Sequence, residues 1–170
     1  TIAKRIAFHT LGCKLNFSET STLSRDSLKY GYENVDSKEF ADIYVFNTCS
    51  VTENANKETR KLIRRSKRIN PNAFIALVGC YAQLKPEELI DIEEVNLVLG
   101  TEDKFELLNY LDQIDFSNDI KSSYSGPIAD VKTFKPSYSS NDRTRSFLKV
   151  QDGCDYNCTF CTIPLARGKS

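Results

Sequence analysis

The chain has 170 residues, with 23 Lys and Arg against 23 Asp and Glu, a single His, six Cys and no Met or Trp. This length fits one domain, or one domain with part of another, and a content of 40% hydrophobic and 27% charged residues is typical of a globular protein. No apolar run approaches the roughly 20 residues that span a bilayer, and no secretion signal begins the sequence. We therefore expect a cytoplasmic protein without membrane contact. A formal net charge of zero argues against the whole chain acting as an electrostatic nucleic-acid binder.

The first part of the chain is predicted to alternate strand, helix and strand. Residues 4–11 are apolar, β-branched and aromatic, as a strand requires. Ser18 and Glu19 are then predicted to cap a helix that ends near residue 30. A second strand is expected over residues 42–48.

The same alternation continues to about residue 111. A long helix is predicted over residues 53–70, closed by the proline that follows it, and a third strand over residues 73–79. A proline opens a short helix over residues 86–93. A fourth strand over residues 96–100 leads into a last helix over residues 101–111. Alternating helices and apolar strands predict an α/β fold, a doubly wound and mostly parallel sheet with helices on both faces.

Three cysteines occupy the same position relative to the predicted strands. Cys13, Cys49 and Cys80 each follow the end of a strand, and the carboxyl ends of parallel strands share one edge of the sheet, where such folds bind ligands. We therefore expect these thiols to converge. The alternative for each is a small buried apolar side chain, which is a common role of free Cys. Three thiolates are one fewer than a 4Fe–4S cluster takes, which would leave one iron open to another ligand.

A change of composition separates this region from the remaining cysteines. Residues 113–143 are rich in Ser and carry two prolines, which predicts a linker between a domain over residues 1–112 and a second one that begins at residues 144–170. Residues 145–151 alternate as a strand does and run into Cys154, Cys158 and Cys161. In a reducing compartment this C-x3-C-x2-C loop favours thiolate ligands of a metal or an iron–sulfur cluster. Zinc, and a disulfide with one free thiol, remain alternatives.

Four motifs carry a resemblance to a known family. The three-cysteine loop with its aromatic Phe160 resembles the signature of the radical S-adenosylmethionine (SAM) superfamily. Together with TLGCKLN, NTCSVT and GCYAQ, the stretch GCDYNCTFCTIPLARG makes the chain similar to the methylthiotransferases, most closely to the branch that acts on N6-threonylcarbamoyladenosine in tRNA. In that family the second domain is a partial (β/α) barrel, of which only the first strand and the cluster loop are expected here.

The resemblance implies roles for individual residues. Cys154, Cys158 and Cys161 would hold the 4Fe–4S cluster that cleaves SAM, with Phe160 near the adenine. The trio Cys13, Cys49 and Cys80 would hold an auxiliary 4Fe–4S cluster used to carry or donate sulfur. Asn16 matches the family's Asn after the first cysteine, and Arg167 with Gly168 matches its Arg-Gly element.

The implied activity is insertion of sulfur and transfer of a methyl group to C2 of N6-threonylcarbamoyladenosine next to the anticodon. Its implied partners are the tRNA substrate, an external electron donor and a sulfur source. Methylthiolation of a ribosomal protein or of isopentenyladenosine are alternatives within the family, and an iron–sulfur electron carrier or a zinc scaffold are alternatives outside it. Because the chain lacks an initial Met and most of the barrel, we expect it to be an inactive piece of a longer protein.

Two further features have open interpretations. Residues 57–68 place seven Lys and Arg at helical spacing with Glu58 as the only acid, which is either a surface for RNA phosphates or a solvated helix face. His9 lies in an apolar run, which favours packing over catalysis.

Overall fold

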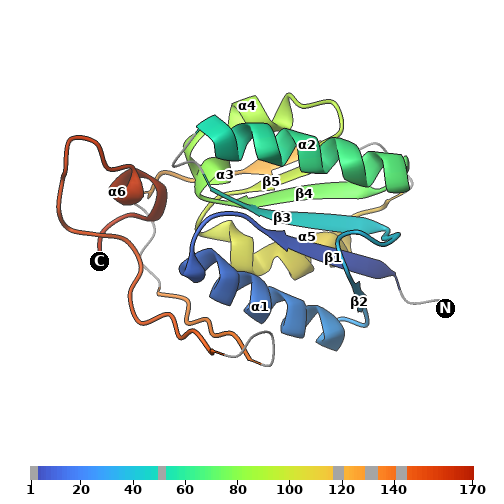
Figure 1. Ribbon diagram of the computed structural model, residues 1–170, viewed down its shortest axis with the longest axis horizontal. Coiled ribbons are helices and arrows are strands. Elements are labelled where there is room, and N and C mark those ends of the chain that lie inside the picture. The colour runs from blue at the N-terminus through green and yellow to red at the C-terminus, as the bar shows by residue number, and fades with distance from the viewer. Residues whose placement is uncertain (1–3, 50–52, 117–120, 129–133, 141–144) are drawn as a thin grey trace.

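Parallel strands form the centre of the computed structural model, with helices on both sides (Figure 1). The structure describes residues 4–49, 53–116, 121–128, 134–140 and 145–170. Its strands are β1 (Arg5–Thr10), β2 (Glu33–Val35), β3 (Ile43–Thr48), β4 (Phe74–Gly79), β5 (Leu97–Leu99) and β6 (Ser122–Tyr124). Its helices are α1 (Lys14–Lys29), α2 (Glu53–Ile69), α3 (Cys80–Leu84), α4 (Pro86–Ile90), the 3-10 helix η1 (Asp103–Glu106), α5 (Leu107–Gln113) and α6 (Ile163–Arg167).

The sheet has the order β2-β1-β3-β4-β5-β6, and every neighbouring pair is parallel. This confirms the predicted α/β fold. The chain adds β2 on one side of β1 and then continues with β3 on the other side. The order therefore reverses between β1 and β3, and ligands of open α/β sheets bind beyond the carboxyl ends of strands at such a reversal.

Alternating side chains fill a core on each face of the sheet. On β3, Tyr44 and Phe46 pack in one cluster with Ile63 of α2, while Ile43 and Val45 pack in the other with Leu23 of α1. The first cluster also includes side chains of α3 and α4, and the second includes leucines of α5. Helices thus cover both faces, as a doubly wound sheet requires.

Several elements differ from the sequence prediction. The first helix begins at Lys14, and Ser18 and Glu19 are buried in its interior rather than capping it. Their polar atoms bond to distant segments of the chain instead, which a local capping pattern does not show. The strand β2 and the helix α3 were not predicted, because the first is a three-residue, partly polar strand and the second is a single short turn.

The region around residues 113–151 also departs from expectation. The composition predicts a linker over residues 113–143, yet β6 within it pairs with β5 as an edge strand of the sheet. The predicted strand over residues 145–151 is wrong: in the described part of this segment, a single antiparallel bridge joins Leu148 to Tyr138. A strand needs a partner along its length, and no other barrel strand stands beside this one in the residues described. The division into domains stays a prediction.

Candidate iron–sulfur site

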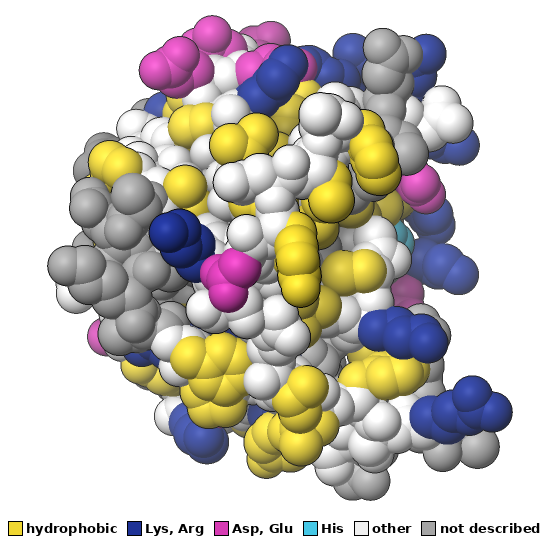
Figure 2. Space-filling model, turned by 90° about the vertical axis from the view of Figure 1, so that its left-hand side faces the viewer, with side chains coloured by type: hydrophobic (Ala, Val, Ile, Leu, Met, Phe, Trp, Pro, Cys, Tyr) yellow, Lys and Arg dark blue, Asp and Glu magenta, His cyan; other side chains and the backbone are white. Residues whose placement is uncertain are grey.

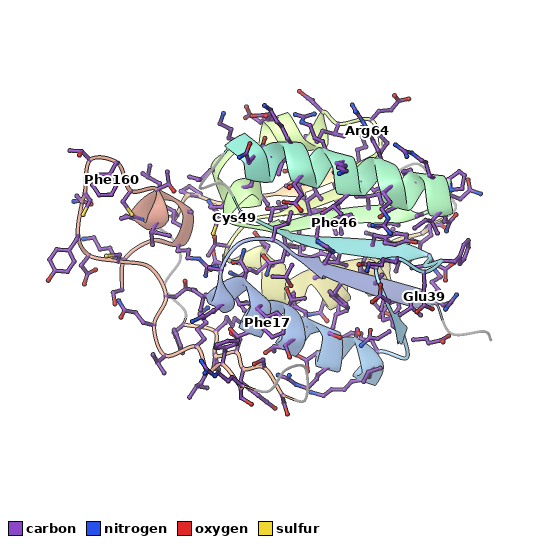
Figure 3. All side chains as sticks on the ribbon, viewed as in Figure 1. Phe17, Glu39, Phe46, Cys49, Arg64 and Phe160 are labelled. Carbon is purple, nitrogen blue, oxygen red and sulfur yellow. The ribbon has the colours of Figure 1, made fainter. Side chains whose placement is uncertain are left out.

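Cys13, Cys49 and Cys80 lie at the carboxyl edge of the sheet, just beyond β1, β3 and β4. Figure 3 shows Cys49 at this edge. Gly12 has a φ of +93°, and a Cβ atom built there would lie 2.7 Å from the Cβ and 2.8 Å from the Sγ of Cys49. The loop after β1 therefore packs in direct contact with the cysteine that follows β3. Exposure decreases along the set: Cys13 is exposed, Cys49 is half-buried and Cys80 is buried.

Two asparagines hold the loops that carry these cysteines. The side-chain amide of Asn16 donates to the carbonyls of Leu11 at 2.9 Å and Thr48 at 3.1 Å, one on each side of the reversal point. In the other direction, Nδ2 of Asn47 donates to the backbone carbonyl of Asn16 at 3.0 Å. Because the donors and acceptors are buried, these bonds cannot be exchanged cheaply for water, and they fix the two loops relative to each other.

A buried cluster of charges lies immediately behind this edge. One oxygen of Glu19, Oε1, accepts from Lys104 Nζ at 2.8 Å, Lys149 Nζ at 3.1 Å and Arg167 Nη1 at 3.0 Å. Asp152 completes the cluster with contacts of 2.5 Å to Lys149 and 2.8 Å to Arg167. The side chain of Glu19 is fully buried, and those of its three cationic partners are 1–2% exposed. Charges this deeply buried are tolerated only when they are paired.

The pKa values of the cluster follow from burial and from these pairs. Burial by itself would raise the pKa of Glu19, but Lys104, Arg167 and Lys149 outweigh it and hold the pKa well below the ordinary value. The pKa of Asp152 is lowered for the same reason, against its own burial. Both carboxyls are therefore ionised at neutral pH.

Arg167 connects the charge cluster with the cysteine edge. Its Nη2 donates to Asn16 Oδ1 at 2.5 Å, and its positive charge acts on the buried thiol of Cys80. Burial raises the pKa of Cys80, whereas the positive charges of Arg167 and Lys104 oppose that rise. A guanidinium beside a buried thiol favours its anionic form, which is the form that binds metals.

The second cysteine group lies on a loop beside the same edge. The backbone N–H of Cys154 donates to the carbonyl of Gly168 at 3.0 Å, and that of Cys161 donates to the carbonyl of Cys158 at 3.1 Å, which closes a turn. Cys154 and Cys161 are half-buried, and Cys158 is exposed. Phe160 is 91% exposed at the outer end of the loop (Figure 3).

The base of this loop is fixed to the sheet although no strand of the sheet belongs to it. Asp152 and Arg167, on either side of the loop, bond to each other and to the charge cluster. Thr101 Oγ1, just after β5, donates to the carbonyl of Ala166 at 2.5 Å. The two cysteine groups are therefore attached to one scaffold.

The six cysteines suit iron–sulfur ligation by their chemistry and placement. All six are free thiols, gathered as three at one sheet edge and three on one loop. Within the described ranges, no three Cys, His, Asp or Glu side chains are close enough together to hold a single metal ion. A multi-iron cluster is larger than one ion, and thiolates are its usual protein ligands.

The sequence motifs singled out the cysteines as candidate ligands but not the charges behind them. Arg167 was singled out only through its motif, and Glu19 was assigned to a helix cap. Lys104, Lys149 and Asp152 were not predicted. One feature of the sequence could have pointed to this cluster. Lys149 lies two residues after Phe147, so in an extended segment both side chains face the same, inward side.

Comparison with known proteins gives the family. A model described as "Uncharacterized protein family UPF0004" matches residues 5–100, which include β1 to β5 and the first three cysteines. The chain belongs to this family. The match does not reach the second cysteine group, which curated relatives do cover.

Three relatives illustrate the range of similarity. The threonylcarbamoyladenosine tRNA methylthiotransferase MtaB of Bacillus subtilis is 43% identical over 96% of this chain and 36% of its own length. The ribosomal protein uS12 methylthiotransferase RimO of Trichodesmium erythraeum is 34% identical over 97% of the chain and 37% of its own length. The tRNA-2-methylthio-N(6)-dimethylallyladenosine synthase of Chloroherpeton thalassium is 32% identical, with coverages of 97% and 37%.

These matches confirm the resemblance to the methylthiotransferase family. The chain spans little more than a third of the length of each of these three relatives. No helix in the described part of the chain has the length and apolar character to cross a membrane.

Proposed function

We propose that this chain is the N-terminal part of a radical SAM methylthiotransferase that converts N6-threonylcarbamoyladenosine of tRNA to its 2-methylthio derivative. The observation that carries the proposal is the attachment of two free-thiol trios to one scaffold, with Arg167 bonded on one side to Asn16, three residues after Cys13, and on the other to Asp152. An electron carrier needs neither an open fourth iron at each trio nor the attachment of both trios to one scaffold. The higher identity to the MtaB relative than to the RimO and dimethylallyladenosine relatives favours this substrate.

Each thiol trio has its own part in the proposal. Cys13, Cys49 and Cys80 would hold the auxiliary 4Fe–4S cluster, and the trio Cys154, Cys158 and Cys161 would hold the SAM-binding one. When bound, the clusters and SAM supply the electron, radical and sulfur chemistry that side chains lack. Each trio leaves one iron of a four-iron cluster without a protein ligand, which suits binding of SAM at one and of sulfur at the other.

The remaining residues bind and orient. Arg167 places positive charge beside Cys80, which stabilises a thiolate in a largely buried position. Asn16 and Asn47 keep the loops after β1 and β3 in register. The exposed ring of Phe160 is free to lie against an adenine. A tRNA substrate and six reduced thiols favour a cytoplasmic location, and the reaction calls for an external electron donor and a sulfur source.

Analysis of tRNA nucleosides tests the substrate. Mass spectrometry of digested tRNA from a strain that lacks the gene should show loss of the 2-methylthio derivative and accumulation of N6-threonylcarbamoyladenosine. An unchanged threonylcarbamoyladenosine profile contradicts the proposal. Loss of methylthiolation on isopentenyladenosine or on a ribosomal protein instead would reassign the substrate within the family.

Iron counting tests the two cluster sites. After anaerobic reconstitution we expect about eight irons per chain, and about four in either Cys49→Ala or Cys154→Ala, because each change leaves one trio intact. Added SAM should perturb the EPR spectrum of Cys49→Ala but not that of Cys154→Ala. Unchanged iron in Cys49→Ala, or colourless protein loaded with zinc, would rule out this assignment.

A further inference from the structure

A basic groove runs along α2 on the side that faces β1. It has a volume of about 710 Å³, and its floor includes His9 of β1 and Leu62 of α2. His9 is half-buried there, with its Nδ1 3.3 Å from Ser37 Oγ and its ring tilted against the core residue Phe46, so it packs at the edge of the core. Figure 2 shows Lys and Arg side chains gathered along the right-hand edge of the molecule, beside its one histidine.

The cations of the groove follow one line on the helix. Lys57, Lys61, Arg65 and Arg68 all line it and all are exposed, whereas Thr59 and Ile63 of the same helix are buried against the sheet. The four cations recur about once per turn, over a length of about 16 Å at 1.5 Å per residue.

Ion pairing distinguishes the groove cations from a neighbouring arginine on the same helix. None of the four has an ion-pair partner among the residues that the structure describes, and Glu58 is the single carboxylate that lines the groove. Arg60, on another side of the same helix, does pair with Glu88 at 3.4 Å. The four cations that line the groove therefore differ from Arg60 in having no carboxylate partner in the described residues.

From this arrangement we propose that the groove binds the phosphodiester backbone of the RNA substrate. A row of exposed cations suits a linear polyanion better than a single phosphate, which is usually held by converging buried donors. Leu62 is the one aliphatic side chain lining the groove, and it is half-buried. A protein partner would be expected to use apolar or aromatic anchors, whereas phosphates need only charge.

The position of the groove relative to the cysteines supports this role. The helix α2 begins at Glu53, four residues after Cys49, and its first turns lie toward the cysteine edge (Figure 1). An RNA strand lying along the groove from Arg68 to Lys57 would thus be led toward that edge. The inference rests on the proposed function, since it takes RNA as the substrate.

Neighbouring arginines on α2 provide a matched test. Arg65 lines the groove, whereas Arg64 is also exposed but is not among the residues that line it. We would measure binding of a fluorescently labelled anticodon stem-loop RNA by anisotropy, with the chain as wild type, Arg65→Gln, Lys61→Gln and Arg64→Gln. Each groove variant should weaken binding about fivefold at 0.1 M salt and reduce the slope of log Kd against log salt by about 0.7, whereas Arg64→Gln should change neither.

The possible outcomes are distinguishable. Equal weakening by Arg64→Gln and Arg65→Gln, or no effect of either, would overturn the groove as the binding surface and leave the proposed function intact. Absence of RNA binding by the chain at low salt would also overturn the groove as the binding surface. The nucleoside analysis tests the proposed function independently of this result. Binding of a polyglutamate peptide as tightly as the RNA would point to an acidic protein partner and so contradict the proposal.

Discussion

At the scale of single residues, the contact between Gly12 and Cys49 determines how closely the first two thiols approach. Two constraints meet at Gly12: a positive φ that side chains disfavour, and the lack of room for a Cβ beside Cys49. The spacing of the cysteines in the sequence shows neither constraint. The glycine is thus part of the thiol site although it offers no ligand.

Replacement of Gly12 separates these two constraints. Gly12→Ala should lower the free energy of unfolding by more than the roughly 1–2 kcal/mol that a left-handed backbone costs, because its Cβ also displaces Cys49. Gly31 provides the control, since its φ is +82° but nothing lies within 4 Å of its Cβ position. Urea unfolding of Gly12→Ala and Gly31→Ala measures the difference. An equal decrease in the free energy of unfolding in the two variants would mean that the contact with Cys49 does not affect stability.

At the scale of elements, the buried charge cluster joins pieces of structure that share no sheet or helix. Glu19 belongs to α1, Lys104 to η1 and Arg167 to α6, while Lys149 and Asp152 lie in an irregular segment. The segment therefore keeps its place against α1 through ion pairs and hydrogen bonds rather than through a ladder of strand bonds. Removing the one carboxylate that contacts three cations leaves those cations buried without their main partner.

Loss of Glu19 should be visible in the pH dependence of stability. The folded-state pKa of Glu19 lies well below its ordinary value of 4.5, so below pH 4.5 the unfolded chain takes up a proton that the folded chain does not. The stabilisation by Glu19 is thus complete above pH 4.5 and is lost as the pH falls below it. Glu19→Gln should cost about 3–5 kcal/mol at pH 7 and should lose less stability than the wild type between pH 7 and pH 3.

Urea unfolding at several pH values gives this comparison. Glu33→Gln is a suitable control, because Glu33 is an exposed partner of Arg5 at 3.9 Å and its removal should cost no more than about 1 kcal/mol. If the pH profiles of Glu19→Gln and the wild type run parallel, the carboxylate is not held ionised by its neighbours.

The elements also show what the sequence can and cannot predict. The runs that became β1, β3, β4 and β5 are apolar and bounded by turn residues, so their hydrophobic pattern identified them and, through them, the edge where three cysteines meet. In β6 the sequence Ser-Ser-Tyr has no such pattern, and its place comes from pairing with β5. Glu19 resembles a capping residue locally, and only the cations 85, 130 and 148 residues away reveal its role.

At the scale of the whole molecule, the sheet and the cysteine loop differ in how much of their surface is protected. The side chains of Tyr44 and Phe46 on β3 are 1% exposed, whereas Tyr156 and Phe160 on the loop are 79% and 91% exposed. The loop is anchored at its base by Asp152 and Arg167 but has few contacts at its tip. Exposed loop tips are the usual first sites of proteolysis.

Limited digestion with chymotrypsin should therefore cut first after Tyr156 or Phe160. Mass spectrometry should find a large product that begins at the N-terminus and ends on the loop, before any cut at Tyr44 or Phe46. Anaerobic loading with iron and sulfide should slow these cuts, because the cluster would tie three loop cysteines together. First cuts within the central strands would contradict this account of the fold.

The sequence separations within the charge cluster have a consequence for the order of events during synthesis. Glu19 is made early, yet its partner Arg167 follows 148 residues later, a delay of about 7–30 s at typical rates of translation. The sheet strands β1 to β5 are complete well before that. Of the three cationic partners of Glu19 in the described residues, a nascent chain would thus hold only Lys104 until Lys149 and Arg167 emerge. Within these 170 residues, the final ion pairs, and with them the placement of the second cysteine group, are therefore among the last native contacts to form.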